Sequence, residues 1–154
     1  MFVPALTGLG APDWDPQARG LIIGITRGTT SAHIARATLE AIAFEVRDIV
    51  TLMETESGSP LHALHVDGGA TADDLLMQIQ ADALGTIVDR SLHTQTTGLG
   101  AAYLAGLGTG VWSSIDELVD SRRSSGRFIP DAGRSYDDQF ARWRDAVERS
   151  KGWA

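Results

Sequence analysis

Residues 61–89 have the sequence LHALHVDGGATADDLLMQIQADALGTIVD, and this stretch decides the fold. Residues 61–66 predict a short strand, which the polar and glycine residues Asp67-Gly68-Gly69 end. An apolar stripe at helical spacing then predicts a helix over residues 72–84. The segment TIVD that follows predicts a second strand. A strand, a connecting helix and a second strand are typical of an α/β layer arrangement with parallel strands.

A long helix is predicted to precede this stretch. Apolar residues recur at spacings of three and four over residues 32–54 and define one predicted buried face: Ala35, Leu39, Ile42, Val46, Ile49 and Met53. Thr30 or Ser31 can cap the start of this helix, and Ser57-Gly58-Ser59-Pro60 ends it. Residues 1–29 are rich in glycine and proline, so they predict a loop-rich start with one short strand near residues 21–25.

The remainder of the chain predicts three further helices. Residues 97–105 form a small-residue helix, residues 115–119 a short helix capped by Ser113 or Ser114, and residues 136–150 a closing helix. Phe140, Trp143 and Val147 share one face of the closing helix. Residues 121–135 are polar and rich in turn-forming residues, so they predict a turn-rich connection. We expect the four tryptophans to be packing anchors rather than a stacking platform.

Composition excludes several classes of protein. The chain has 154 residues, of which 43% are hydrophobic and 21% charged, and this favours one globular domain. Its net charge of -7 disfavours a nucleic-acid binder. The absence of cysteine excludes a disulfide framework and a thiolate nucleophile, and it fits a reducing cytoplasm. No apolar run approaches the ~18 residues that span a membrane, and no signal peptide is evident.

The turn after the first strand is the strongest site candidate. Val66 leads through Asp67 into Gly68 and Gly69, and a helix follows. Glycines allow a ligand to approach the backbone closely, while the N–H groups and positive dipole end of the helix suit phosphate or ribose oxygens. Ligands of open α/β sheets also bind outside the carboxyl ends of strands. For two glycines alone, an ordinary strand-to-helix turn is the alternative.

Other groups carry weaker signals. Asp73 and Asp74 are adjacent on the predicted helix and do not face one another, so Asp73 either contacts a ligand or places favourable charge in the first helical turn. Arg122, Arg123 and Arg127 form a small basic cluster, which we interpret as a solvated loop. The four histidines lack the spacing of a metal site, and no phosphate loop or serine-nucleophile motif occurs.

Many segments match one known family in order along the chain. They are residues 2–12 (FVPALTGLGAP), 14–16, 18–20, 24–28 (GITRG), 33–34, 36–43, 66–70 (VDGGA), 76–78, 99–107, 143, 146–150 and 152–153. These segments resemble the glycerol kinases of the FGGY carbohydrate kinase family and cover essentially the whole chain. The motif TGLGAP at residues 7–12 favours the glycerol kinase branch over the xylulose and gluconate kinases.

The resemblance implies a partial ribonuclease-H-like α/β domain of the actin-like ATPase superfamily. Residues 1–154 would be the later part of the nucleotide-binding C-terminal domain, with the N-terminal polyol-binding domain absent. The implied reaction transfers the γ-phosphoryl group of ATP, with Mg²⁺, to glycerol and gives glycerol 3-phosphate. The family's catalytic aspartate lies upstream, so Asp13, Asp15 and Asp67 are not predicted to be that base. We expect the chain alone to be inactive.

The resemblance also carries over a nucleotide site. Gly69 matches the glycine whose backbone contacts ADP, Gly68 lies beside it, and Asp73 matches an asparagine that contacts the nucleotide. Asp73-Asp74 replaces the family's Asn-Asn, and aspartate accepts hydrogen bonds but does not donate them. The added negative charge therefore predicts altered affinity or purine preference. Gly98 stands where the family usually has alanine, which predicts a looser helix.

Two rival hypotheses and several partners follow. The chain could belong to an FGGY kinase for another polyol or sugar, or it could be a non-catalytic truncated fragment. The expected partners are ATP or ADP with Mg²⁺, and glycerol in the full-length enzyme. Missing strands would expose a sheet edge and an apolar face, so we expect a homo-oligomer or association with the missing N-terminal part. We expect no nucleic-acid or membrane partner and a cytoplasmic location.

Overall fold

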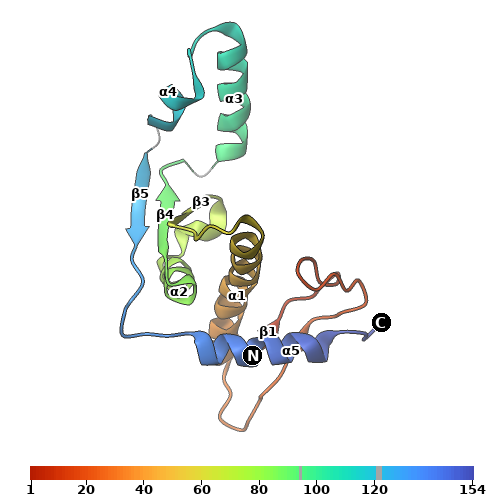
Figure 1. The fold of residues 1–154 in the computed structure, drawn as a ribbon. Helices are drawn as coiled ribbons and strands as arrows, with labels where there is room; N and C mark the ends of the chain where they lie inside the picture. The colour runs from red at the N-terminus through yellow and green to blue at the C-terminus, as the bar shows by residue number, and fades with distance from the viewer. Residues whose placement is uncertain (94, 121–122) are drawn as a thin grey trace.

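The computed structural model describes residues 1–93, 95–120 and 123–154. A long helix, α1 (Ser31–Ser57), is crossed by the C-terminal helix α5 (Asp137–Ser150), and a small sheet lies beside α1 (Figure 1). Two more helices, α3 (Thr96–Thr109) and α4 (Ile115–Asp120), extend beyond one end of that sheet. The mixture of helices and sheets agrees with the predicted α/β class.

The boundaries of α1 follow from its capping residues. Thr30 is the N-cap, and its backbone N–H donates to Nδ1 of His33 at 3.1 Å. His33 thus takes the place that Glu or Gln occupies in the usual capping box. At the other end Gly58 adopts the left-handed conformation with φ of 66°, which glycine tolerates best. Both predicted ends of the helix are therefore confirmed to within a few residues.

The predicted buried face of α1 is only partly correct, because Leu39 packs against the core but other members of the face do not. Ile42, Ile49 and Met53 are 37%, 38% and 63% exposed. The buried residues of the helix are Ala41, Ala43, Phe44 and Val50. Helix α1 carries more than one apolar stripe, and its neighbours decide which stripe is covered. Helix α2 (Asp74–Leu84) packs along one side, where Gln80 donates to the Ala43 carbonyl at 3.2 Å, and α5 packs near Phe44.

The sheet contains β3 (Ala63–Val66), β4 (Ile87–Ser91) and β5 (Ser124–Phe128), in the order β3-β4-β5 for the described residues. Strands β3 and β4 are parallel and are joined through α2, as predicted. Strand β5 runs antiparallel to β4, and it lies where we predicted a turn-rich connection. That prediction is wrong because the sequence SSGRF offers little apolar alternation, and backbone pairing with β4 makes the strand.

A second, two-stranded sheet closes the other end of the core. Strand β1 (Phe2–Val3) pairs antiparallel with β2 (Leu21–Ile22), which is shorter than the predicted strand. The largest fully buried side chains are Trp143, Phe44, Ile79, Val3, Val88 and Val147. Trp143 therefore anchors packing as expected, whereas Trp14 and Trp153 are 75% and 77% exposed, so the same expectation is wrong for them.

Helix α3 is apolar around its circumference. Residues 96–109 contain no Asp, Glu, Lys or Arg, yet Leu104 is 73% exposed. Tyr103 packs edge-on against Trp112, with ring centroids 5.3 Å apart. Helices that are apolar on all sides are normally buried. Most of the apolar surface of α3 is left uncovered by the other described parts of the chain.

Candidate functional site

The sequence-predicted glycine turn, residues 67–73, connects β3 to α2. Gly68 has φ of 91° and ψ of 170°, a region that is essentially restricted to glycine. Residues Gly69–Ala72 form one turn of 3₁₀-helix, and Asp73 is the N-cap of α2. A Cβ atom added at Gly68 or Gly69 would meet nothing within 4 Å. The side-chain positions of both glycines therefore face open space at the carboxyl end of a strand.

Thr71 holds the glycine turn together from inside. It is only 5% exposed, and its hydroxyl and backbone N–H both donate to the Gly68 carbonyl, at 2.7 and 3.2 Å. The backbone N–H of Asp73 donates to the Ala70 carbonyl at 3.3 Å. These bonds fix the path of the backbone between the strand and the helix. The open geometry at Gly68 and Gly69 is thus part of an ordered turn.

The two adjacent aspartates have separate partners. The Asp73 side chain accepts from the backbone N–H of Leu76 at 3.1 Å, which is an N-capping bond. The Asp74 carboxylate lies 2.7 Å from Nη1 of Arg90 in an ion pair. Asp73 stays exposed beside Gly69, so capping the helix does not remove it from solvent. The two carboxylates therefore bond to different partners, as expected for side chains that do not face one another.

Sequence reasoning missed Arg90, the last-but-one residue of β4. Besides Asp74, its Nη1 atom donates to the backbone oxygen of Thr71 at 2.8 Å. Its guanidinium carbon lies 5.3 Å from the centre of the Phe128 ring. Arg90 thus joins β4 and β5 to the glycine turn. No spacing or motif in the sequence signals this contact, because it depends on the register of the two strands.

A cavity of about 450 Å³ adjoins the glycine turn at the carboxyl ends of β3 and β4. The Thr96 hydroxyl donates to the Asp67 carboxylate, and both residues line the cavity. Its polar side is formed by His65, Asp67, Asp89, Ser91, His93, Thr96 and Arg123, and its apolar side by Leu99, Gly100, Tyr103, Ile115, Leu118 and Val119. The start of α3 and the end of β3, the strand that leads into Gly68, therefore line the same cavity.

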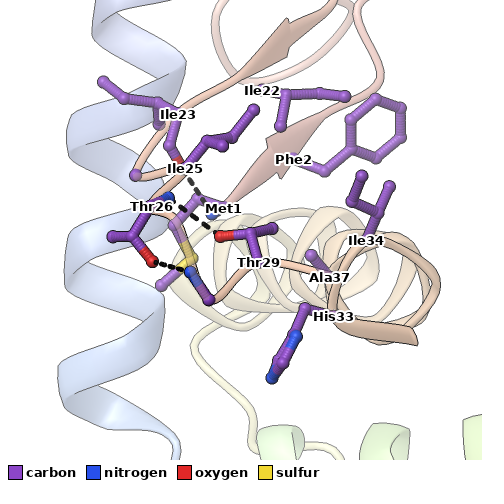
Figure 2. Close-up of a pocket in the computed structure, with 12 residues that line it drawn as sticks. Met1, Phe2, Ile22, Ile23, Ile25, Thr26, Thr29, His33, Ile34 and Ala37 are labelled. Carbon is purple, nitrogen blue, oxygen red and sulfur yellow. Dashed lines mark hydrogen bonds between the residues drawn. The ribbon is translucent and has the colours of Figure 1, made fainter. Parts of the chain in front are cut away.

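A separate cavity of about 290 Å³ lies between β1, the segment after β2 and the start of α1 (Figure 2). Ile22, Ile23 and Ile25 line it and are 45%, 36% and 62% exposed. Its polar groups are used locally: the backbone N–H of Thr26 donates to Thr29 Oγ1 at 2.9 Å, and the His33 ring points away from the isoleucines. This cavity is therefore an apolar depression remote from the glycine turn.

A cluster of ion pairs joins the N-terminal loop to α1 and to the C-terminal end of the chain. Arg144 lies 2.8 Å from Asp13 and 2.7 Å from Asp48, and Lys151 lies 2.7 Å from Asp13. The hydrogen bond that Arg144 donates to Asp13 lowers the pKa of Asp13, and the hydrogen bond that Lys151 donates to Asp13 raises the pKa of Lys151. Burial raises the pKa of Asp48 despite Arg144, and burial followed by repulsion from Asp48 raises the pKa of Glu45.

The early aspartates Asp13 and Asp15 have partners near the two ends of the chain. Asp13 is held by Arg144 and Lys151 in the cluster between the N-terminal loop and α5. Asp15 accepts from the backbone N–H groups of Gln17 at 2.8 Å and Gly152 at 3.0 Å, and these two bonds lower its pKa, the bond from Gln17 most. Both carboxylates lie outside the glycine turn.

The described residues offer no evident site for a metal ion. No group of three or more His, Asp or Glu side chains in residues 1–93, 95–120 and 123–154 is arranged to hold one.

Of the predicted basic cluster, Arg123 and Arg127 are exposed, and Arg122 lies outside the described residues. In the same part of the chain, no helix is both long enough and apolar enough to cross a membrane.

The fold and the turn define a partial α/β domain with an open strand-to-helix junction. The sequence model for the C-terminal domain of the FGGY family of carbohydrate kinases matches residues 1–109. The chain belongs to this family. Its predicted fold, part of a domain of the actin-like ATPase type, is confirmed by its similarity to solved FGGY kinases.

The similar curated proteins are glycerol kinases. The chain is 56% identical to the glycerol kinase of Aromatoleum aromaticum and 53% identical to glycerol kinase 1 of Saccharolobus solfataricus, over 154 residues in both cases. Each alignment covers 99% of this chain and 31% of the relative. The chain therefore spans about 31% of the length of the curated relatives that it matches.

Solved structures agree with this assignment. The Plasmodium falciparum glycerol kinase with ADP has a TM-score of 0.82 and 39% identity, over 97% of this chain and 30% of that one. The ligand-bound xylulose kinase of Lactobacillus acidophilus has a TM-score of 0.83 and 26% identity, over 99% of this chain and 32% of that one. The sequence is thus more similar to the glycerol kinase at an equal likeness of fold.

Proposed function

We propose that residues 1–154 are the later part of the nucleotide-binding C-terminal domain of a glycerol kinase. The complete enzyme would transfer the γ-phosphoryl group of ATP to glycerol and release glycerol 3-phosphate and ADP. The 53–56% identity to glycerol kinases supports this substrate, against 26% for a xylulose kinase. A kinase for another polyol or sugar stays the alternative, because we assign no polyol-binding residue to this chain.

The observation that supports nucleotide binding best is the open backbone of the glycine turn. No side chain fills the space beside Gly68 and Gly69, so a ligand can approach their backbone just before α2, where a helix start favours anionic or polar ligand atoms. We assign Gly68 and Gly69 to the nucleotide through their backbone and Asp73 through its exposed carboxylate. The solved relative that contains ADP supports this choice of ligand.

Catalysis requires more than this turn. Phosphoryl transfer depends on positioning the phosphates, on neutralising their charge and on a base for the nucleophile. We assign no catalytic residue to this chain, and the expected Mg²⁺ would come with the nucleotide rather than be held by a group of its carboxylates. The isolated chain should therefore not phosphorylate glycerol, and activity above that of buffer would contradict this division of roles.

Association with other protein is part of the proposal. The exposed side chains Ile22, Ile23 and Ile25 and the uncharged helix α3 leave much apolar surface in contact with water. We propose that a second copy or the remainder of the kinase covers it.

A cytoplasmic location is supported by the absence of cysteine, which suits a reducing compartment.

Thermal unfolding with and without ADP and Mg²⁺ tests nucleotide binding. A ligand that binds only the folded chain stabilises it by ~2.7 kcal/mol at a hundredfold excess over Kd. We expect a saturable rise in Tm that is lost in Gly69→Leu, whose side chain would occupy the open space. Gly10→Leu is the matched control, because Gly10 is also exposed and has open space at its Cβ position. No rise in a cooperatively folded wild-type chain would contradict the proposal.

A further inference from the structure

We propose that Arg90 is a positioning residue for the glycine turn: through Thr71 and Asp74 it keeps the backbone of Gly68 and Gly69 in its open orientation. The proposal rests on the proposed function for its link to nucleotide. Arg90 belongs to β4 and not to the glycine turn, yet its contacts would hold the turn in the conformation that binds the nucleotide. Arg90 touches no nucleotide in this account and acts only through the turn.

The contacts form one continuous path from Arg90 to Gly68. Nη1 of Arg90 donates to the Thr71 carbonyl at 2.8 Å and to the Asp74 carboxylate at 2.7 Å. Thr71 in turn donates twice to the Gly68 carbonyl, from its hydroxyl at 2.7 Å and from its N–H at 3.2 Å. Arg90 therefore holds the turn at its middle and at the first residue of α2.

Arg90 is itself held in place by β5. Its side chain is only 19% exposed, its guanidinium carbon lies 5.3 Å from the Phe128 ring centre, and its Nε donates to Ser125 Oγ at 3.3 Å. A Cβ atom added at Gly126 would lie 3.0 Å from Nη2 of Arg90, so the glycine leaves room for the guanidinium group. Contacts with strand β5 thus hold the Arg90 side chain in the orientation in which it reaches the glycine turn.

The ion pair also changes the charge that a nucleotide would meet. Asp74 is one of two aspartates that stand where the resemblance expects asparagine, and its carboxylate is 74% exposed. Arg90 sets one positive charge against it, at hydrogen-bond distance. Of the two added negative charges, that of Asp74 is paired with a cation, whereas that of Asp73 meets only the capping N–H and the start of α2. Because Asp74 is exposed, the ion pair adds little to the stability of the whole chain. Its expected effect is on the local geometry of the turn.

Arg90→Gln tests the proposal against a closely matched control, Arg47→Gln. Arg47 lies 2.6 Å from Asp137, its guanidinium carbon is 4.3 Å from the Phe140 ring centre, and the two side chains are 22% and 74% exposed. Like Arg90, it pairs with an exposed aspartate and lies over an aromatic ring, but those partners are outside the glycine turn. A general loss of arginine contacts would affect both variants alike.

Amide hydrogen exchange without nucleotide is the first measurement. We expect the amides of residues 68–73 to exchange roughly tenfold faster in Arg90→Gln, and within about twofold of wild type in Arg47→Gln. The amides of α1 and α5 should not change in Arg90→Gln. Arg90→Lys, which keeps the charge but not the planar fork, should fall between and serves if Arg90→Gln does not fold. Equal exchange of the turn in both glutamine variants would overturn the proposal.

ADP affinity, measured by calorimetry on the same variants, is the second measurement. We expect Kd to rise roughly tenfold in Arg90→Gln and to stay unchanged in Arg47→Gln. If wild type binds ADP and Arg90→Gln binds it equally well, the positioning role is overturned even where exchange is faster. If wild type does not bind ADP but the exchange contrast is present, the proposed function fails while the hold of Arg90 on the turn stands.

Discussion

The indole Nε1 of Trp143 donates a hydrogen bond of 2.9 Å to the backbone oxygen of Phe2, which joins the last helix to the first strand across 141 positions of the chain. The Trp143 ring is 2% exposed, and its centroid lies 5.8 Å from that of Phe44 on α1. One side chain thus connects β1, α1 and α5. Residues beyond the part matched by the family model complete the core.

This contact predicts a strong dependence of stability on Trp143. Trp143→Ala should lower the free energy of unfolding by ~3–5 kcal/mol, because a large buried side chain is removed. Trp143→Phe should cost less, since only the hydrogen bond and part of the ring are lost. Trp14→Ala is the control, because Trp14 is 75% exposed and should change stability by about 0.5 kcal/mol or less. Similar losses in urea for Trp143→Ala and Trp14→Ala would contradict this packing.

The backbone of Gly68 predicts a substitution that is costly without any steric clash. Gly68→Ala should destabilise the chain by ~1–3 kcal/mol, because its φ of 91° and ψ of 170° suit glycine alone. Gly98→Ala should instead stabilise it by ~0.5–1 kcal/mol, because Gly98 lies within α3 and has open space around it. Thermal unfolding of the two variants gives shifts of opposite sign. A neutral Gly68→Ala would show that the turn tolerates a side chain.

The two roles of Asp73 can be separated by two substitutions. Asp73→Asn keeps a side-chain oxygen for the Leu76 N–H and removes a negative charge, so we expect an almost unchanged Tm and tighter binding of ADP. Asp73→Ala loses the cap and should cost ~1 kcal/mol of stability. Calorimetric titration with ADP and thermal unfolding measure the two effects. Weaker ADP binding by Asp73→Asn than by wild type would contradict the electrostatic argument.

Glu45 predicts a pH-dependent effect on stability. Burial raises its pKa in the folded chain, and Asp48 adds to the rise. The folded chain therefore holds this proton more tightly than the unfolded chain, so the group costs stability as the pH rises above the ordinary glutamate pKa of about 4.3. Glu45→Gln removes the charge, so the variant should be more stable than wild type at pH 7.

The sign of the Glu45 effect can be checked by thermal unfolding over a pH series. The advantage of Glu45→Gln should shrink as the pH falls and vanish once Glu45 is protonated in both states of the wild-type chain. The loss of the Asp13 ion pairs in acid affects both chains and cancels in the comparison. An advantage that is constant from pH 7 to pH 4, or a variant less stable at pH 7, would contradict the burial of this carboxylate.

Local sequence signals predicted the parts of the fold that depend on neighbouring residues. The cap at Thr30, the end at Gly58 and the parallel pairing of β3 with β4 all follow from residue types at fixed short spacings. Strand β5 was not predicted from the sequence, because SSGRF becomes a strand only through its pairing with β4. The predicted buried face of α1 was confirmed only at Leu39, since packing against other elements decides which apolar stripe of the helix is buried.

The candidate site divides in the same way. Gly68, Gly69 and Asp73 were predicted as site residues because a strand, two glycines and a helix are contiguous in sequence and because the segment resembles the family's nucleotide site. Arg90 was missed because its contact with Thr71 spans 19 positions and depends on the strand register. The capping role of Asp73 could be foreseen as favourable charge at a helix start, whereas the Asp74–Arg90 pair could not.

The central claim is that a nucleotide binds at the glycine turn, and amide NMR spectra of the ¹⁵N-labelled chain test it most directly. We predict that titration with ADP and Mg²⁺ shifts the amide signals of Gly68, Gly69 and Asp73 in a saturable way, with little change near Ile23 and Ile25 in the apolar cavity of Figure 2. A saturable shift confined to that cavity, or none at the turn of a folded chain, would contradict the claim.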